Sequence, residues 1–302
     1  MKSSPVIHFW SATPTPLTAD RRVDLPAVER MVHDALANRI SGLFLGGTCG
    51  EGAWLPNRER SRLIKAVAAA AGGRLELVAQ VSDNSLPRIL DNIHDAAEAG
   101  ATVAMIASPA TMLNATPERI AAHFEEAVAA SPLPVGIYDL GAHRPYSIPV
   151  DRLRRILLLP KVKLVKDSSG MPERQAAALA ARAEKPSLML FNGDEFACLK
   201  YLEAGYDGFM FGGAIAVAPH MHRIAELFLA GRLEEARAAD EEMRTILYGI
   251  YGGKNISCWL TGLKYYLVRK GLFATTESFL GYPLTDECRA AIERYVQTGA
   301  AR

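Results

Sequence analysis

The stretches TVAMIA (residues 102–107), TPERIAAHFEEAVAA (116–130) and VGIYD (135–139) follow one another along the chain. The first and third are short and almost wholly apolar, which is typical of parallel strands buried on both faces. The stretch between them repeats apolar residues at helical spacing and opens with Thr116, a capping residue, followed by Pro117. A buried strand, a helix and a second buried strand are the repeating unit of a parallel sheet.

The same alternation continues in both directions from this unit. We expect eight strands, at residues 6–12, 42–46, 75–81, 102–107, 135–139, 162–166, 188–192 and 208–211. Helical patterns follow them, at residues 25–37, 57–71, 85–99, 116–130, 150–158, 172–183, 195–204 and 219–230. Eight strand–helix pairs in roughly 230 residues predict the α/β class and a (β/α)8 (TIM) barrel. An open, doubly wound sheet is the alternative, although it usually has fewer repeats.

The part of the chain after the eighth pair reads as further helices, at residues 232–248, 255–270 and 285–298. We therefore expect a barrel over residues 1–231 and a helical extension over residues 232–302 that packs on it. The extension is too short for a separate enzyme domain, so it is a candidate for contacts between subunits.

The composition excludes several classes of protein. Lys and Arg number 34 against 33 Asp and Glu, so the formal net charge is +1. Binding to nucleic acid or to an anionic membrane needs a net or clustered positive field, so we expect neither partner. No apolar run approaches the roughly 20 residues that span a bilayer, and residues 1–10 lack the apolar region of a signal peptide. The four cysteines lie far apart, which predicts reduced thiols in a cytoplasmic protein without a zinc or redox motif.

Functional groups of such a barrel lie at the carboxyl ends of its strands. Lys166 stands at such an end, after the apolar residues Leu164 and Val165, so it is expected to enter the barrel mouth. Burying an ammonium group is costly, so burial favours the neutral amine, which attacks ketones to form imines. The alternative is a lysine paired with Asp167 or extended into solvent.

Two further strand ends carry candidate groups. Tyr138 ends an apolar strand, and its phenol can move protons if it reaches the same mouth; the alternative is a core tyrosine with a satisfied hydroxyl. The turn GGTCGEG at residues 46–52 can expose backbone N–H groups beside the Thr48 hydroxyl, as a nest for a carboxylate. It matches neither a Walker nor a dinucleotide-binding motif, and the alternative is a tight turn without a ligand.

Together these motifs resemble one family. Gly47-Thr48-Cys49-Gly50-Glu51 resembles the Gly-Thr-Thr-Gly-Glu loop of the pyruvate-dependent class I aldolases, the dihydrodipicolinate synthase and N-acetylneuraminate lyase family. Tyr138 and, twenty-eight residues later, Lys166 in the context Val-Lys-Asp-Ser-Ser-Gly look like the tyrosine and the Schiff-base lysine of that family. Asn192-Gly193-Asp194-Glu195 resembles its loop after the seventh strand.

The resemblance implies a lyase or aldolase that needs no metal and no organic cofactor. It implies that Lys166 forms an imine with pyruvate or another 2-oxo acid, that Tyr138 shuttles protons and that Thr48 relays them. It also implies a homo-oligomer, either a tetramer or a dimer. Other residues expected to bind the 2-oxo acid are Gly47, Cys49, Gly193 and Met210.

The sequence departs from the family pattern at three places. Cys49 replaces the second threonine of the loop, so one hydroxyl donor is lost. Thr111 stands where the synthases place a tyrosine that crosses to a neighbouring subunit. The arginine expected five residues after Tyr138 is His143 here, with Arg144 next to it, and both are candidate contacts to substrate. These departures argue against dihydrodipicolinate synthase itself.

Asp194 and Glu195 favour a substrate rich in hydroxyl groups, because carboxylates accept hydrogen bonds from them. The alternative is that Asp194 caps the following helix and Glu195 stabilises its N-terminus. Our first prediction is an aldolase or dehydratase for a 2-keto-3-deoxy sugar acid, which releases or consumes pyruvate. One alternative is 4-hydroxy-tetrahydrodipicolinate synthase (dihydrodipicolinate synthase), which condenses pyruvate with aspartate semialdehyde. The other is an inactive barrel that binds a 2-oxo acid as a sensor.

Overall fold

Eight parallel strands form a closed barrel in a computed structural model that describes residues 6–299. They are β1 (His8–Ser11), β2 (Gly42–Leu45), β3 (Glu76–Gln80), β4 (Val103–Ala107), β5 (Val135–Asp139), β6 (Val162–Asp167), β7 (Met189–Asn192) and β8 (Gly208–Phe211). The first strand pairs with the last, with Trp10 opposite Met210, so the sheet has no free edge. This closure excludes the open, doubly wound alternative.

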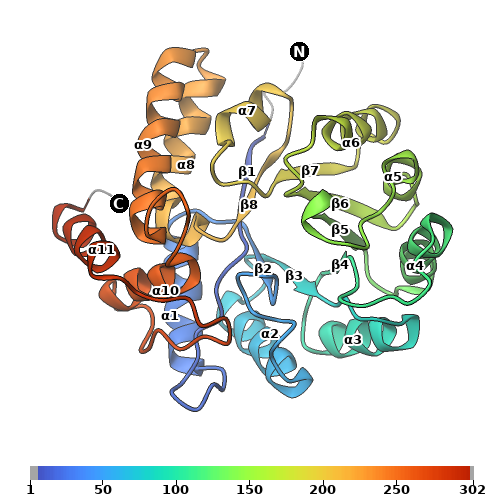
Figure 1. Cartoon of the computed structure of the whole chain (residues 1–302), viewed down its shortest axis with the longest axis horizontal. Helices are drawn as coiled ribbons and strands as arrows, with labels where there is room; N and C mark the ends of the chain where they lie inside the picture. The colour runs from blue at the N-terminus through green and yellow to red at the C-terminus, as the bar shows by residue number, and fades with distance from the viewer. Residues whose placement is uncertain (1–5, 300–302) are drawn as a thin grey trace.

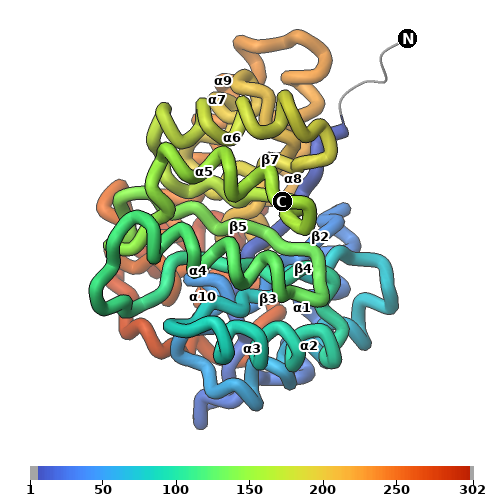
Figure 2. The backbone as a smooth tube through the Cα atoms, turned by 90° about the vertical axis from the view of Figure 1, so that its right-hand side faces the viewer, coloured from blue at the N-terminus to red at the C-terminus, as the bar shows by residue number. Residues whose placement is uncertain are grey.

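Helices surround the barrel, as Figure 1 shows. They are α1 (Leu25–Ala37), α2 (Asn57–Ala71), α3 (Leu86–Glu98), α4 (Pro117–Ala130), α5 (Val150–Leu157), α6 (Pro172–Glu184), α7 (Cys198–Glu203) and α8 (Ala214–Leu229). In the side view of Figure 2, α3, α4, α5 and α6 follow one another around the outside. Three more helices, α9 (Leu233–Tyr251), α10 (Trp259–Arg269) and α11 (Asp286–Thr298), lie together on one side of the barrel.

The predicted fold class, a (β/α)8 barrel with a C-terminal helical extension, is confirmed. The division at residues 231 and 232 stays a prediction, and the terminal residues 1–5 and 300–302 that it includes lie outside the described residues. Among residues 6–299, none of the helices has the length and apolar character that crossing a bilayer requires.

Local sequence signals explain where several helices begin and end. The Thr116 side chain accepts a hydrogen bond from the backbone N–H of Arg119 at 3.3 Å, and α4 then begins at Pro117, as predicted. Gly72 ends α2 with a φ of 55°, a left-handed conformation that glycine adopts without steric strain. These signals fix the lengths of the helices that connect one barrel strand to the next.

The prediction of a helix over residues 195–204 is wrong at its start, because α7 begins only at Cys198. The Asn192 side chain accepts a hydrogen bond from the backbone N–H of Asp194 at 2.7 Å. The Asp194 side chain in turn accepts one from the backbone N–H of Phe196 at 2.9 Å. These two bonds fold residues 192–196 into a turn, so Asp194 caps this turn rather than the helix.

The helix predicted over residues 219–230 also starts elsewhere, because α8 begins at Ala214 and contains Pro219 in its interior. Proline has no N–H to donate and its ring clashes with the preceding turn. The backbone accommodates it at Val217, whose φ of −125° and ψ of 24° depart from helical values. In the extension, α9 continues to Tyr251 and α10 begins at Trp259, whereas the sequence predicted an end at 248 and a start at 255.

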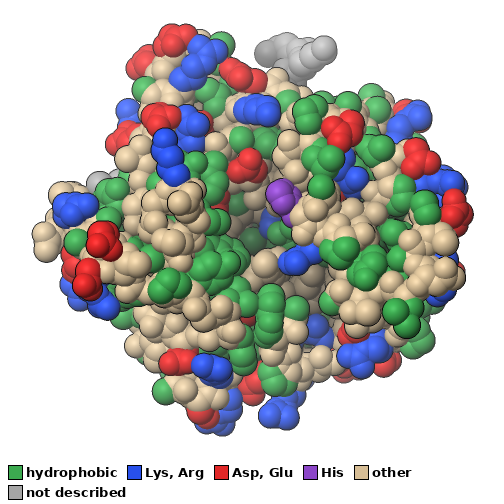
Figure 3. Space-filling model, viewed as in Figure 1, with side chains coloured by type: hydrophobic (Ala, Val, Ile, Leu, Met, Phe, Trp, Pro, Cys, Tyr) green, Lys and Arg blue, Asp and Glu red, His purple; other side chains and the backbone are tan. Residues whose placement is uncertain are grey.

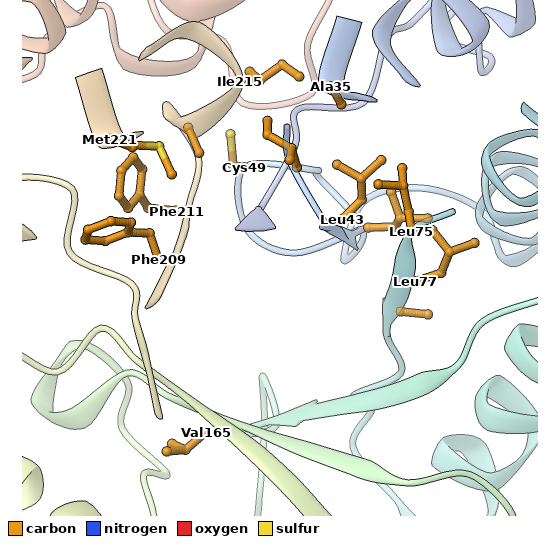
Figure 4. Packing of buried hydrophobic residues seen from close by; sticks show 14 of the residues in the cluster. Ala35, Leu43, Cys49, Leu75, Leu77, Val165, Phe209, Phe211, Ile215 and Met221 are labelled. Atoms are coloured by element: carbon orange, nitrogen blue, oxygen red, sulfur yellow. The ribbon is translucent and has the colours of Figure 1, made fainter. Parts of the chain in front are cut away.

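Apolar side chains form two layers, one inside the barrel and one between the strands and the surrounding helices. The inner layer fills the barrel with large side chains, among them Trp10, Phe44, Phe191 and Met210. The outer layer packs the strands against the helices, and Figure 4 shows part of it, with Leu43, Val165 and Phe209 on strands. Strand residues alternate between the two layers, so a side chain at a strand end points either into the barrel mouth or toward the helices.

Candidate active site

Lys166 and Tyr138 lie side by side in the barrel mouth. Strands β5 and β6 pair with Tyr138 opposite Lys166. The Nζ atom of Lys166 is 4.0 Å from the centre of the Tyr138 ring and 5.2 Å from the centre of the Phe44 ring. Lys166 is 4% exposed and Tyr138 is 6% exposed. The lysine head group is therefore held among aromatic faces rather than in solvent, which excludes the solvent-exposed alternative.

The carboxylates next to these two residues are engaged elsewhere. Alternate residues of a strand point to opposite faces, so Asp139 and Asp167 face the helices. Asp167 accepts a hydrogen bond from the Tyr206 hydroxyl at 2.7 Å. Asp139 forms a buried ion pair with Arg174 at 2.7 Å. Asp167 is thus not the partner of Lys166, and the paired-lysine alternative is wrong for this carboxylate.

The Tyr138 phenol is surrounded by groups that favour loss of its proton. Burial acts to raise the pKa of Tyr138, but the charge of Lys166 and contacts with the Lys166, Thr48 and Ser168 side chains outweigh it and lower that pKa. A phenol with a lowered pKa exchanges its proton more readily near neutral pH. The geometry therefore combines the buried amine and phenol with the hydroxyl groups of two half-buried residues in one cluster.

The turn over residues 46–52 packs tightly because of its glycines. A Cβ atom on Gly52 would lie 2.0 Å from the carbonyl oxygen of Gly46, so no other residue fits there. Within residues 6–299, the backbone N–H groups of Thr48 and Cys49 donate no hydrogen bond. Unused N–H groups on successive residues of a turn form a small site for an anion.

The Cys49 side chain itself belongs to the outer core. A Cβ atom on Gly212 would lie 2.9 Å from the Cys49 sulfur, and Cys49 packs in the cluster that includes Ile215 (Figure 4). Burial, followed by the charge of Glu195, raises the pKa of this thiol. Cys49 is therefore a packing residue through its side chain, and only its backbone is free for a ligand.

The other residues expected at the pyruvate site lie around the same cluster. A Cβ atom on Gly193 would lie 2.0 Å from the Ser168 hydroxyl and 2.9 Å from Cε of Lys166, so only glycine lets this loop pass the lysine. Met210 is fully buried in the inner layer. A Cβ atom on Gly47 would lie 2.7 Å from the Phe44 ring, so Gly47 packs on the aromatic wall.

Glu195 is half-buried near the same cluster, and its carboxylate contacts the protein. It accepts a hydrogen bond from the backbone N–H of Gly213 at 2.7 Å, and the Tyr251 hydroxyl faces it. Burial raises the pKa of Glu195 to about 7, although Gly213, Tyr251 and the charge of Lys166 act in the opposite direction. Asp194 caps the turn before α7. One oxygen of each carboxylate that suggested a hydroxyl-rich substrate therefore binds a backbone N–H group of the protein itself.

The structure does not bring the remaining candidates into contact with Lys166. His143 ends the short 3₁₀ helix η1 (Gly141–His143), and both His143 and Arg144 are exposed. Their side chains form no hydrogen bond or ion pair within residues 6–299. Thr111 is exposed and its backbone N–H donates to the Asn84 side chain at 3.0 Å. Figure 3 shows that the face over the barrel is hollowed at its centre, with charged side chains around the hollow.

Sequence reasoning missed two residues of the cluster. Ser168 lies two positions after Lys166 and contacts Tyr138, and its place in the Lys-Asp-Ser-Ser motif could have indicated it. Phe44 meets the Tyr138 ring edge-on at 5.7 Å, and only the barrel register reveals that contact. Among residues 6–299, no group of three or more His, Cys, Asp or Glu side chains is arranged to hold a metal ion.

We expect the Glu195→Gln variant to be more stable than the wild type at pH 8 and to lose that advantage toward pH 4. The pKa of Glu195 is raised from 4.5 to about 7, so ionisation destabilises the folded state increasingly as the pH rises between these values. The full effect above pH 7 is at most about 3 kcal/mol. Thermal unfolding at pH 5 and pH 8 measures it, with Glu29→Gln on the exposed face of α1 as control. A gain of equal size at both pH values would contradict the burial of an ionising carboxylate.

Comparison with known proteins agrees with this fold. The model of the dihydrodipicolinate synthetase family matches residues 6–297. The 4-hydroxy-tetrahydrodipicolinate synthase of Cutibacterium acnes is 26% identical over 86% of this chain and 88% of its own. That of Corynebacterium diphtheriae is 29% identical over 77% of this chain and 76% of its own. The prophage protein YagE of E. coli K12, solved in complex with pyruvate, has a TM-score of 0.86 at 17% identity, with 99% of each chain covered. The chain belongs to the dihydrodipicolinate synthetase family.

Proposed function

We propose that this enzyme is a pyruvate-dependent class I aldolase whose imine forms on Lys166. The observation that carries the proposal is the buried Lys166 amine beside the Tyr138 phenol. The amine attacks the ketone carbon of a 2-oxo acid, a C–N bond forms and water leaves. The protonated imine accepts electrons from the neighbouring carbon, so a carbon–carbon bond can form or break there.

The groups around Lys166 supply the other parts of this chemistry. Tyr138, with its lowered pKa and its contact to Thr48, carries protons to and from the reacting atoms. The free N–H groups of Thr48 and Cys49 hold the carboxylate of the 2-oxo acid. Gly193 lets the loop after β7 pass close to Lys166, because a Cβ atom there would clash with the Ser168 and Lys166 side chains. No metal and no organic cofactor takes part in these steps.

For the second substrate, the named relatives and the contacts of Asp194 and Glu195 favour the synthase reaction over the sugar-acid reaction that we predicted first. The relatives from C. acnes and C. diphtheriae both bear the name 4-hydroxy-tetrahydrodipicolinate synthase. The sugar-acid prediction depended on Asp194 and Glu195, and both side chains bind backbone groups of the protein itself. We therefore place the condensation of pyruvate with aspartate semialdehyde first.

A specific observation keeps the sugar-acid aldolase or dehydratase as the second candidate. Thr111 is small and exposed at the position where the synthases place a crossing tyrosine. His143 stands at the position of the arginine that binds the semialdehyde carboxylate, and Arg144 is one residue further along. Each candidate reaction uses the same imine, so the choice between them rests on the groups at the rim.

The proposal includes a homo-oligomer in the cytoplasm. The four cysteines are all free, which agrees with a compartment that keeps thiols reduced. Contacts between subunits would place a neighbouring chain near the exposed loop of Thr111. The assembly can be measured by light scattering on the purified protein.

We expect borohydride to trap pyruvate on Lys166. Reduction of the imine makes the C–N bond permanent, so the mass of a reduced pyruvate adduct is added to a peptide that contains Lys166. The Lys166→Ala variant should gain no such mass, whereas the control Lys200→Ala, an exposed lysine on α7, should be labelled like the wild type. Absence of an adduct at saturating pyruvate, or an adduct on another lysine, would refute the proposed imine.

We further expect the enzyme to consume pyruvate and aspartate semialdehyde together. The Tyr138→Phe variant should turn over at least about a hundredfold more slowly and still form the trapped imine, because proton transfer and amine attack use different groups. Coupled assays with both substrates, and release of pyruvate from a panel of 2-keto-3-deoxy acids, distinguish the two reactions. Turnover of the panel alone would favour the second candidate. Thermal stabilisation by pyruvate without any turnover would favour the sensor.

A further inference from the structure

A buried ion pair connects the turn over residues 46–52 to the C-terminal extension. Glu51 lies in this turn, three residues after Thr48, and Lys264 lies on α10. The Lys264 ammonium contacts the Glu51 carboxylate, and both side chains are 0% exposed. The two residues thus form a buried contact between a loop of the candidate active site and a helix that follows the barrel.

Both charged groups of this pair also form hydrogen bonds with the segment over residues 277–279. Glu51 accepts hydrogen bonds from the Ser278 hydroxyl at 2.8 Å and from the backbone N–H of Phe279 at 2.5 Å. Lys264 also donates to the backbone carbonyl of Glu277 at 2.6 Å. A buried charge that loses its partner is strongly destabilising. The segment over residues 277–279 and α10 therefore hold the Glu51 carboxylate in one position.

The backbone of Glu51 explains why an anchor is needed. Its φ is 57°, in the left-handed region that a residue with a long side chain rarely adopts. The neighbouring Gly50 carbonyl accepts a hydrogen bond from the Thr15 hydroxyl at 2.6 Å, and Gly52 packs against Gly46. A backbone conformation that is unfavourable by itself persists only when its surroundings fix it. The ion pair supplies part of that constraint.

The turn has contacts on both its Thr48 and its Glu51 residue. Thr48 and Lys166 both contact Tyr138. Lys264 holds the turn through Glu51. A displacement of Glu51 would therefore move Thr48 relative to Tyr138.

We propose that Glu51 and Lys264 are positioning residues for the reaction. They hold Thr48 against the Tyr138 phenol and aim the N–H groups of Thr48 and Cys49 at the carboxylate of the 2-oxo acid. This inference rests on the proposed function, since it assigns the pair to the same site. It makes the C-terminal extension a part of the active site rather than only a packing element.

The test is the double variant Glu51→Gln with Lys264→Met, which removes both charges and leaves no buried ion without a partner. We expect borohydride still to trap pyruvate on Lys166, because the lysine itself is untouched. The KM for pyruvate should rise about ten- to a hundredfold. The limb of the pH–rate profile that reports Tyr138 should move to higher pH, because the contact with Thr48 that lowers the pKa of the phenol is lost.

A matched control is the double variant Arg182→Met with Asp207→Asn. Arg182 lies on α6 and Asp207 lies just before β8, and the two form an ion pair at the other end of the barrel from the candidate active site. Its loss should lower the melting temperature without changing KM or the pH–rate profile. If the Glu51–Lys264 variant behaves like this control, the pair is only structural and the inference is overturned.

Ser278→Ala provides a milder test should the double variant not fold. It removes one hydrogen bond to Glu51 and keeps the ion pair, so KM and the pH–rate limb should shift in the same directions by smaller amounts. Unchanged values in a folded Ser278→Ala variant, together with a double variant that does not fold, would also overturn the inference. Failure of the wild type to form an imine would instead refute the proposed function and leave the ion pair as a structural observation.

Discussion

Pairing of β1 with β8 closes the sheet, and every feature of the candidate site depends on that closure. A closed parallel barrel gathers all its carboxyl strand ends into one ring, whatever their separation along the chain. Within this ring the register of β5 and β6 places Tyr138 opposite Lys166, and Lys166 lies opposite Phe191 on β7. A shift of one residue in β6 would turn Lys166 toward the helices and place Val165 or Asp167 at the mouth in its stead.

The near-neutral charge of the whole chain is compatible with recognition of an anion, because the positive character is local. Lys166 lies on aromatic faces, with the nearest strand carboxylates turned away toward Arg174 and Tyr206. The free N–H groups of the turn at Thr48 add partial positive charge without any net charge. The proposed binding of a small 2-oxo acid is thus compatible with a formal net charge of +1.

Periodicity and capping predicted the order of the strands and helices, and family motifs predicted the central residues Lys166 and Tyr138. The predictions that failed depend on side-chain contacts that periodicity does not show, one within a turn and the others between residues far apart in the sequence. The helix α7 starts later than predicted because Asp194 accepts a hydrogen bond within a turn. Glu195 accepts a hydrogen bond from the backbone N–H of Gly213, which follows the next strand. Glu51 and Lys264 are separated by 213 positions, and no local pattern indicates that they meet. Their contact follows from the packing of the extension on the barrel.

The imine on Lys166 would be visible in a crystal structure of the protein grown with pyruvate. We expect continuous density between the Lys166 nitrogen and the former ketone carbon. We also expect the carboxylate of the adduct within hydrogen-bond distance of the N–H groups of Thr48 and Cys49. An unmodified Lys166 at saturating pyruvate, or pyruvate bound away from the turn over residues 46–52, would contradict this expectation.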